Sequence, residues 1–115
     1  MTLDLAVLVS GSGSNLQSII DRVEAGVLDA RIRLVLSNKP EAYGLERAKK
    51  HGIPTACLEH STFPVREAFD AEMVRIIRAH GPTTVAMAGF MRMVTPVFLG
   101  AFPGQVVNIH PALLP

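Results

Sequence analysis

The chain has 115 residues, of which 49% are hydrophobic and 18% are charged, and its net charge is +1. This composition predicts a globular chain with a real core, and the small net charge without a sustained basic run argues against a nucleic-acid-binding surface. The longest apolar run, residues 85–91, is far shorter than the roughly 20 residues that a membrane-spanning helix needs, so we expect a cytoplasmic protein without a membrane partner.

Apolar runs and helical stripes alternate along the chain. An apolar run over residues 3–9 predicts a buried parallel strand, and the spacing of apolar residues over 16–23 then predicts a helix that ends near Gly26. The further elements predicted in chain order are a strand over 31–37, a helix over 44–50, a strand over 54–58, a helix from about Pro64 to before Gly81, a strand over 83–88, a helix over 96–101 and a strand over 105–109. This alternation predicts an α/β fold, in which a doubly wound parallel sheet carries helices on both faces.

The single cysteine, Cys57, excludes a disulfide framework and a cysteine-based metal site within this chain. Because it lies in an apolar stretch, we expect it to be a small core residue. His51, His60 and His80 stand singly at helix ends or in loops and are expected to be structural or exposed. Arg47, Lys49 and Lys50 are expected to form a solvated helix face. No cluster of metal ligands is predicted.

The first strand is followed by a loop rich in glycine and serine, Ser10-Gly11-Ser12-Gly13-Ser14-Asn15. Glycines allow a backbone to approach a ligand closely, and Ser14 with Gln17 fits a capping box at the start of the next helix, where an anion is favoured. A dinucleotide site would need a third glycine where Leu16 stands, and an ATP-binding loop would need a lysine. The loop therefore predicts a monophosphate site, with a simple tight turn as the alternative left open.

Asn108 and His110 lie two residues apart on the last predicted strand, just before Pro111. Side chains two apart on a strand point to the same face, and the carboxyl end of a strand is the usual ligand position in an open α/β sheet. A buried polar pair that satisfies loop backbone groups is an equally open interpretation of these two residues.

Six segments in register along the chain resemble the folate-dependent glycinamide ribonucleotide formyltransferase family (phosphoribosylglycinamide formyltransferase). They are the segments Ser10–Gln17, Ser37–Lys39, Ala42–Ala48, Arg66–Asp70, Ala88–Arg92 and Asn108–Pro115. The resemblance implies a Rossmann-like formyltransferase fold, of which residues 1–115 form the N-terminal, nucleotide-binding part of a single domain. It also implies the transfer of a formyl group from 10-formyltetrahydrofolate to the amine of glycinamide ribonucleotide in purine biosynthesis.

The resemblance assigns roles residue by residue. Gly13, Ser14 and Asn15 would hold the phosphate and ribose of the nucleotide. Arg66, Met91, Arg92, Met93, Val94 and Asn108 would contact the folate, with the segment 91–94 acting largely through its backbone. Asn108 and His110 would flank the formyl carbon without a metal. Attack of an amine on that carbon gives a tetrahedral intermediate, whose oxyanion Asn108 and a protonated His110 would stabilise.

Members of this family are considerably longer than 115 residues, and their histidine pairs with an aspartate that would lie beyond Pro115. We therefore expect this chain to be part of a longer one, and the piece alone to be almost inactive. Two alternatives stay open: a phosphate-binding fragment without activity, and a related formyltetrahydrofolate-using enzyme. Among the latter, the serine- and glycine-rich loop argues against a methionyl-tRNA formyltransferase, and Pro111 after His110 argues against a formyltetrahydrofolate hydrolase.

Overall fold

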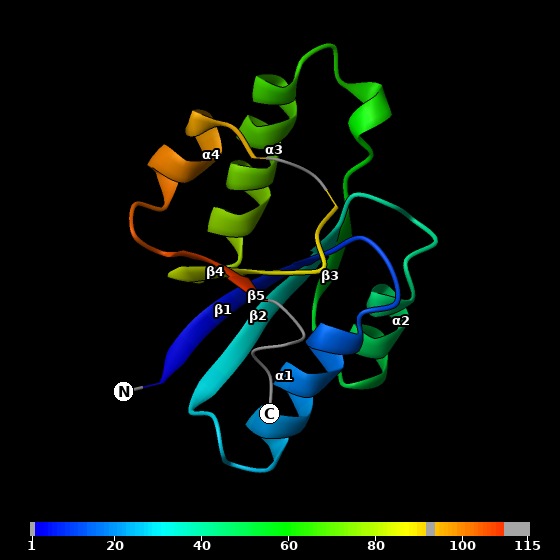
Figure 1. The fold of residues 1–115 in the computed structure, drawn as a ribbon, viewed down its shortest axis with the longest axis vertical. Helices are drawn as coiled ribbons and strands as arrows, with labels where there is room; N and C mark the ends of the chain where they lie inside the picture. Colours follow the sequence, from blue (N-terminus) through cyan, green and yellow to red (C-terminus); the bar gives the residue numbers. More distant parts are fainter. Residues whose placement is uncertain (1, 92–93, 110–115) are drawn as a thin grey trace.

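The computed structural model describes residues 2–91 and 94–109, in which strands and helices alternate as predicted (Figure 1). The elements are β1 (Leu3–Val9), α1 (Ser14–Glu24), β2 (Ala30–Ser37), α2 (Tyr43–Lys50), β3 (Thr55–Cys57), the short 3-10 helix η1 (His60–Thr62), α3 (Arg66–Ala79), β4 (Thr84–Ala88), α4 (Pro96–Ala101) and β5 (Val106–Ile109).

The strands form one parallel sheet in the order β3-β2-β1-β4-β5. β1 lies in the middle, where it pairs with β2 on one side and with β4 on the other. The chain thus builds outward from β1 to β3, then crosses to the other side of β1 and continues from β4 to β5. This order confirms the doubly wound parallel sheet.

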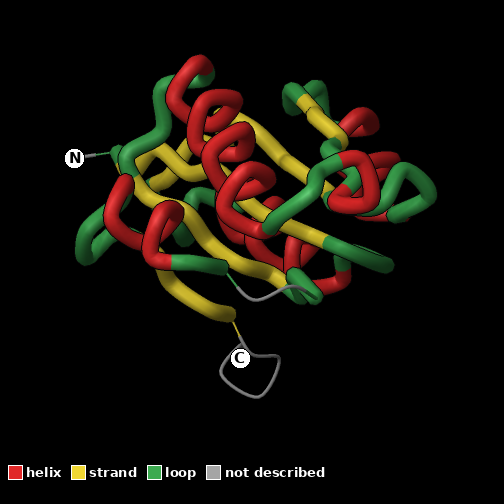
Figure 2. The backbone as a smooth tube through the Cα atoms, turned by 90° about the horizontal axis from the view of Figure 1, so that it is seen from above, coloured by secondary structure: helices red, strands yellow, loops and turns green. Residues whose placement is uncertain are grey.

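The central strand is apolar along almost its whole length because the sheet is covered on both faces. Leu5, Val7 and Val9 pack with α1 and α2, whereas Ala6 and Leu8 pack with α3 and α4. Seen from above (Figure 2), helices lie on both sides of the strands. The two faces therefore form two hydrophobic clusters that share the strands between them.

The order of the strands creates a switch point between β1 and β4. After β1 the chain turns to α1 on one face, and after β4 it leads to α4 on the other face. Connections that diverge in this way leave a crevice at the carboxyl ends of the two strands, which is where α/β proteins of this kind bind ligands.

The start of α1 departs from the prediction. Its N-cap is Gly13, with φ 75°, and no side chain of the described residues caps the helix, so the capping box predicted for Ser14 and Gln17 is wrong. A Cβ added to Gly13 would lie 2.6 Å from the Cα of Gly44. Since the cap packs directly against another segment of backbone, glycine occupies it and Ser14 is already the first helical residue.

Two further predictions are wrong in detail. The helix expected to contain Pro64 in its first turn begins at Arg66, with the extended Val65 as its N-cap. β3 has only three residues and lies at the end of the strand order, where it pairs with β2 alone. Cys57 ends this short strand, at the edge of the sheet that the described residues form, and it is exposed, not a core residue.

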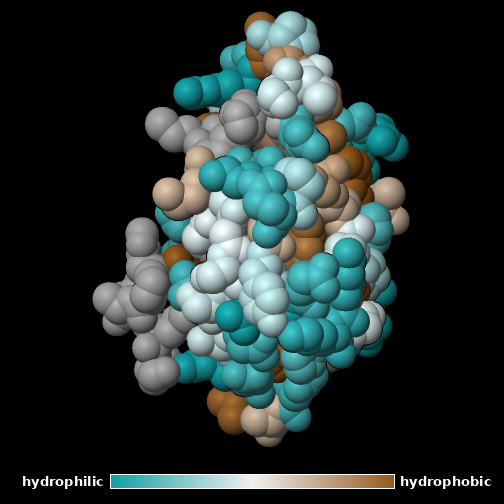
Figure 3. All heavy atoms as spheres, turned by 90° about the vertical axis from the view of Figure 1, so that its right-hand side faces the viewer, coloured by the Kyte–Doolittle hydropathy of each residue, from teal (hydrophilic) through white to brown (hydrophobic). Residues whose placement is uncertain are grey.

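The surface on the side of α2 is mostly hydrophilic (Figure 3). Glu46, Lys49 and Lys50 of α2 are exposed there. Within the described residues, no helix combines the length and the apolar character that crossing a membrane would require.

Candidate functional site

A hollow of about 230 Å³ lies at the switch point between β1 and β4. Its walls are the loop of residues 10–15, the end of β4 with Gly89 and Met91, and Lys39 after β2. The hollow therefore collects the carboxyl ends of three neighbouring strands, and the glycine- and serine-rich loop forms most of it.

The predicted phosphate residues come together at the start of α1. Gly13, Ser14 and Asn15 all line the hollow, and the first hydrogen bond of the helix runs from the Gln17 N–H to the Gly13 carbonyl at 2.8 Å. The amides of the first helical turn have no acceptor within their own helix, and the helix dipole is positive at this end. The arrangement suits a bound anion such as a phosphate.

Ser10 connects the three strand ends. Its hydroxyl donates to Asn38 Oδ1 at 2.6 Å and accepts from the Met91 N–H at 2.7 Å. Both Ser10 and Asn38 are buried. Sequence reasoning treated Ser10 as one loop residue among six and gave Asn38 no role, although each is a polar residue directly after a buried strand, which is a usable signal.

Lys39 is a second residue that sequence reasoning missed. The Ser37 hydroxyl donates to the Lys39 carbonyl at 2.8 Å and accepts from the Lys39 N–H at 3.0 Å, which holds the turn after β2. This turn brings Lys39 to the wall of the hollow, and a lysine beside the hollow favours an anion there.

Arg47 was expected on a solvated helix face, and this expectation is wrong. Its side chain is half-buried, and its Nε donates to the carbonyl of Ser12 in the phosphate loop at 2.7 Å. The helical pattern of α2 could not reveal this contact, because the two residues are 35 positions apart.

Asn108 lies on β5 opposite Met87 in the register of the sheet, and it is exposed. It points to the same side as Val106, two residues earlier, which packs toward the face covered by α3 and α4. Asn108 does not line the hollow. His110 lies outside the described residues, so a shared face for Asn108 and His110 stays a prediction.

The residues predicted to contact a folate are only partly brought together. Met91 is 77% exposed and lines the hollow beside the phosphate loop. Val94 packs against the cluster under α3 and α4, and Arg66 is exposed at the start of α3, away from the hollow. Arg92 and Met93 lie outside the described residues.

A buried carboxylate, which sequence reasoning also missed, holds the start of α4. Asp70 on α3 is fully buried, and its Oδ2 accepts a hydrogen bond from the backbone N–H of Thr95 at 2.6 Å. Thr95 is the N-cap of α4. A buried side chain thus accepts a hydrogen bond from the backbone N–H of Met91 and another from that of Thr95.

A larger hollow, of about 340 Å³, lies at the amino end of β2. Its rim includes Glu24 Oε2 and His51 Nδ1, 2.6 Å apart, and its floor is apolar, with Ile20 and Ile32. Because it is remote from the carboxyl ends of the strands and from the phosphate loop, the smaller hollow is the better candidate for a substrate site.

The model of the formyl transferase family matches residues 3–115. The chain is 46% identical over 113 residues to phosphoribosylglycinamide formyltransferase of Escherichia coli (strain K12), an alignment that covers 98% of this chain and 53% of the relative. It is also 46% identical over 113 residues to the trifunctional purine biosynthetic protein adenosine-3 of Drosophila melanogaster, with 96% of this chain and 8% of that protein covered.

Solved structures show the same similarity. Glycinamide ribonucleotide transformylase 1 from Symbiobacterium toebii superposes with a TM-score of 0.92 at 42% identity, and the match covers 99% of this chain and 54% of that one. Phosphoribosylglycinamide formyltransferase from Coxiella burnetii gives a TM-score of 0.91, also at 42% identity. The chain thus spans about half the length of these bacterial relatives.

Proposed function

This chain belongs to the formyl transferase family, and from that premise we propose that it is the nucleotide-binding part of an enzyme that formylates glycinamide ribonucleotide, with 10-formyltetrahydrofolate as the formyl donor. The name of the Escherichia coli relative, which is 46% identical over 113 residues, supports this substrate, and the name of the Drosophila melanogaster relative supports purine biosynthesis. The proposed enzyme is a folate-dependent one-carbon transferase of purine biosynthesis. Its cytoplasmic setting and its lack of nucleic-acid and membrane partners stay predictions.

The hollow between β1 and β4 is the observation that carries the proposal. It combines the loop of residues 10–15, the N-terminus of α1 and the cation of Lys39. These groups suit a phosphate monoester, because they offer backbone amides and positive potential without the residues that a dinucleotide or a triphosphate would require. We assign the phosphate and the ribose of the nucleotide to Gly13, Ser14 and Asn15.

The folate would lie beside this nucleotide, toward Met91 and the face of α3. Met91 is exposed at the rim of the hollow, its N–H donates to the Ser10 hydroxyl, and the N–H of Thr95 donates to the Asp70 carboxylate. We propose that Arg66, Met91, Arg92, Met93, Val94 and Asn108 contact the folate, which supplies the formyl carbon.

The proposed chemistry places Asn108 and His110 at the formyl carbon. When the substrate amine attacks, a C–N bond forms and the carbonyl oxygen becomes an oxyanion, toward which the Asn108 amide donates a hydrogen bond. Collapse of the oxyanion then breaks the bond between the formyl carbon and the donor nitrogen. His110 would donate to the oxyanion when protonated, or move the proton lost by the amine to that departing nitrogen. An aspartate in the further part of the relatives' length is expected to orient the histidine.

A formyl-transfer assay tests the proposal. The intact protein that contains this chain is incubated with glycinamide ribonucleotide and 10-formyltetrahydrofolate, and the formylated nucleotide is measured by mass spectrometry. Saturable formation of that product supports the proposal. Binding of the nucleotide without turnover would favour a non-catalytic phosphate-binding protein, and water as the preferred acceptor would favour a hydrolase.

A further inference from the structure

Two carbonyl groups of the phosphate loop accept hydrogen bonds from α2, which packs against the loop. The Gly44 N–H donates to the Gly11 carbonyl at 3.1 Å, and Arg47 Nε donates to the Ser12 carbonyl at 2.7 Å. In a trans peptide the N–H points opposite to the C=O. The amides of Ser12 and Gly13 therefore point away from α2, and both residues line the hollow.

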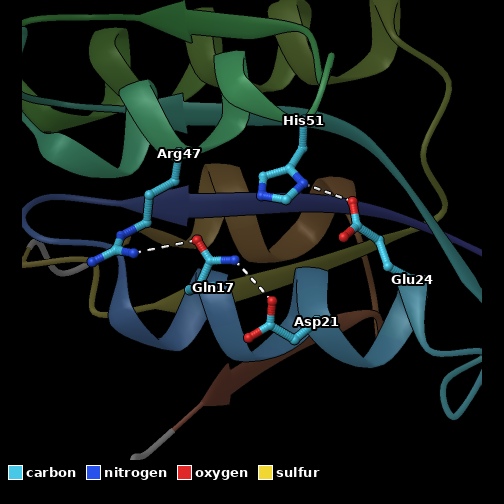
Figure 4. Close-up of polar contacts among 5 residues, drawn as sticks. All are labelled: Gln17, Asp21, Glu24, Arg47 and His51. Carbon is cyan, nitrogen blue, oxygen red and sulfur yellow. Dashed lines mark hydrogen bonds and ion pairs between the residues drawn. The ribbon is translucent and has the colours of Figure 1, made fainter.

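The guanidinium of Arg47 is itself fixed in place. Its Nη1 donates to Gln17 Oε1 at 3.2 Å, and Gln17 Nε2 donates in turn to Asp21 Oδ1 at 2.9 Å (Figure 4). On its other side, Arg47 Cζ lies 4.9 Å from the centroid of the Tyr43 ring. A planar guanidinium is well suited to this combination of a stacked ring and divergent hydrogen bonds, and a lysine ammonium is not.

The loop also packs tightly against α2, which leaves little room for another arrangement. Gly13 is buried, and a Cβ at this position would lie 2.6 Å from Gly44 Cα and 3.3 Å from Arg47 Cδ.

We propose that Arg47 is a positioning residue for phosphate binding, which fixes the Ser12 carbonyl so that the loop amides are preorganised toward the bound phosphate. Arg47 acts through the loop and does not contact the phosphate itself. The inference rests on the proposed nucleotide site, and it goes beyond it by assigning part of the affinity to a residue behind the loop. Preorganised donors bind an anion without the cost of ordering the loop.

The test compares three variants of the intact protein: Arg47→Lys, Arg47→Met and, as a matched control, Lys49→Met. Lys49 carries the same charge on the same helix, but it is exposed and pairs with Glu46 at 3.7 Å. Affinities for glycinamide ribonucleotide and for inorganic phosphate are measured by isothermal titration. Arg47→Met and Arg47→Lys should both raise the Kd for the nucleotide roughly tenfold, whereas Lys49→Met should leave it within about twofold.

Steady-state kinetics separate positioning from a general loss of structure. Both Arg47 variants should raise the KM for the nucleotide, with the KM for the folate and the kcat at saturation little changed. A wild-type affinity in Arg47→Lys would mean that charge alone suffices and would overturn the inference, as would an equal loss in Lys49→Met. If the wild-type protein binds the nucleotide without transferring a formyl group, the proposed function fails while the titrations still decide the role of Arg47. If it binds neither probe, both proposals fail.

Discussion

The hydroxyl of Ser10, at the end of β1, accepts a hydrogen bond from the backbone N–H of Met91, beyond the end of β4, at 2.7 Å. This contact joins the phosphate loop to the segment assigned to the folate, over 81 positions of sequence. Because the same hydroxyl donates to Asn38, one buried oxygen sets the spacing of the three strand ends around the hollow.

Ser10→Ala should therefore disturb both substrate sites. The change leaves the buried Asn38 Oδ1 and the part-buried Met91 N–H without this partner, and a buried polar group without a hydrogen bond costs roughly 1–3 kcal/mol. We expect a lower free energy of unfolding in urea and a higher KM for both substrates. Ser18→Ala is the control, since the Ser18 hydroxyl makes a single contact of 3.4 Å, to the Ser14 carbonyl, in the described structure. Equal effects of the two changes would contradict the role of Ser10.

Gly13→Ala tests the close approach between the phosphate loop and α2. A side chain at φ 75° costs roughly 1–2 kcal/mol, and the added Cβ would also meet Gly44 Cα at 2.6 Å, which adds about 1–3 kcal/mol of overpacking. Gly26→Ala is a matched control, because Gly26 has the same φ of 75° with nothing within 4 Å of the added atom. The difference between the losses of unfolding free energy in the two variants measures the cost of the clash with Gly44. Equal losses would mean that the loop moves to relieve the clash and would contradict a rigid contact.

Asp70→Ala should destabilise the junction between α3 and α4. It removes the buried acceptor of the Thr95 N–H, and we expect a loss of about 2–3 kcal/mol in thermal or urea unfolding. Asp70→Asn retains a carbonyl oxygen for that N–H and should lose less. Glu67→Ala, at an exposed position on the same helix, should cost no more than about 1 kcal/mol. An equal loss in the alanine and asparagine variants at residue 70 would contradict this account.

Cys57 should react slowly with alkylating reagents at neutral pH although it is exposed. Partial desolvation raises the pKa of its thiol, and the carboxylates of Glu59 and Glu41 raise that pKa further. Because only the thiolate reacts, the pH midpoint of iodoacetamide labelling should lie above that of the same cysteine in urea-unfolded protein. Glu59→Gln should move the midpoint down. Labelling is measured by peptide mass spectrometry. A pH midpoint in the folded protein at or below that in the unfolded protein would contradict the raised pKa of Cys57.

The order and type of the main elements were predictable because the fold uses simple patterns. Buried parallel strands favour nearly continuous apolar runs, and residues 3–9 and 85–88 provide them, so the strands predicted over 3–9 and 83–88 were correct to within one residue. The short edge strand was less predictable. Its three residues pair with β2 alone, which leaves Cys57 exposed in a stretch whose apolar character indicated a core position.

The candidate site was predictable only where its residues are neighbours in sequence. The loop from Ser10 to Asn15 could be predicted as a ligand-binding loop from its local sequence, because its glycines directly precede a helix. The contacts that hold it come from far along the chain: Arg47 reaches the Ser12 carbonyl, and Met91 reaches Ser10. Helical periodicity placed Arg47 on a solvated face, since periodicity describes one helix and carries no information on which loop packs against it.

The most direct test of the central claim is the kcat of formyl transfer by the intact protein and by its Asn108→Ala variant, under saturation with glycinamide ribonucleotide and 10-formyltetrahydrofolate. Loss of one donor to the oxyanion should lower kcat by about 100-fold or more, with far smaller changes in both KM values. His110→Ala should show the same pattern. Wild-type turnover in the Asn108→Ala variant would contradict the assignment of this strand end to the reacting carbon.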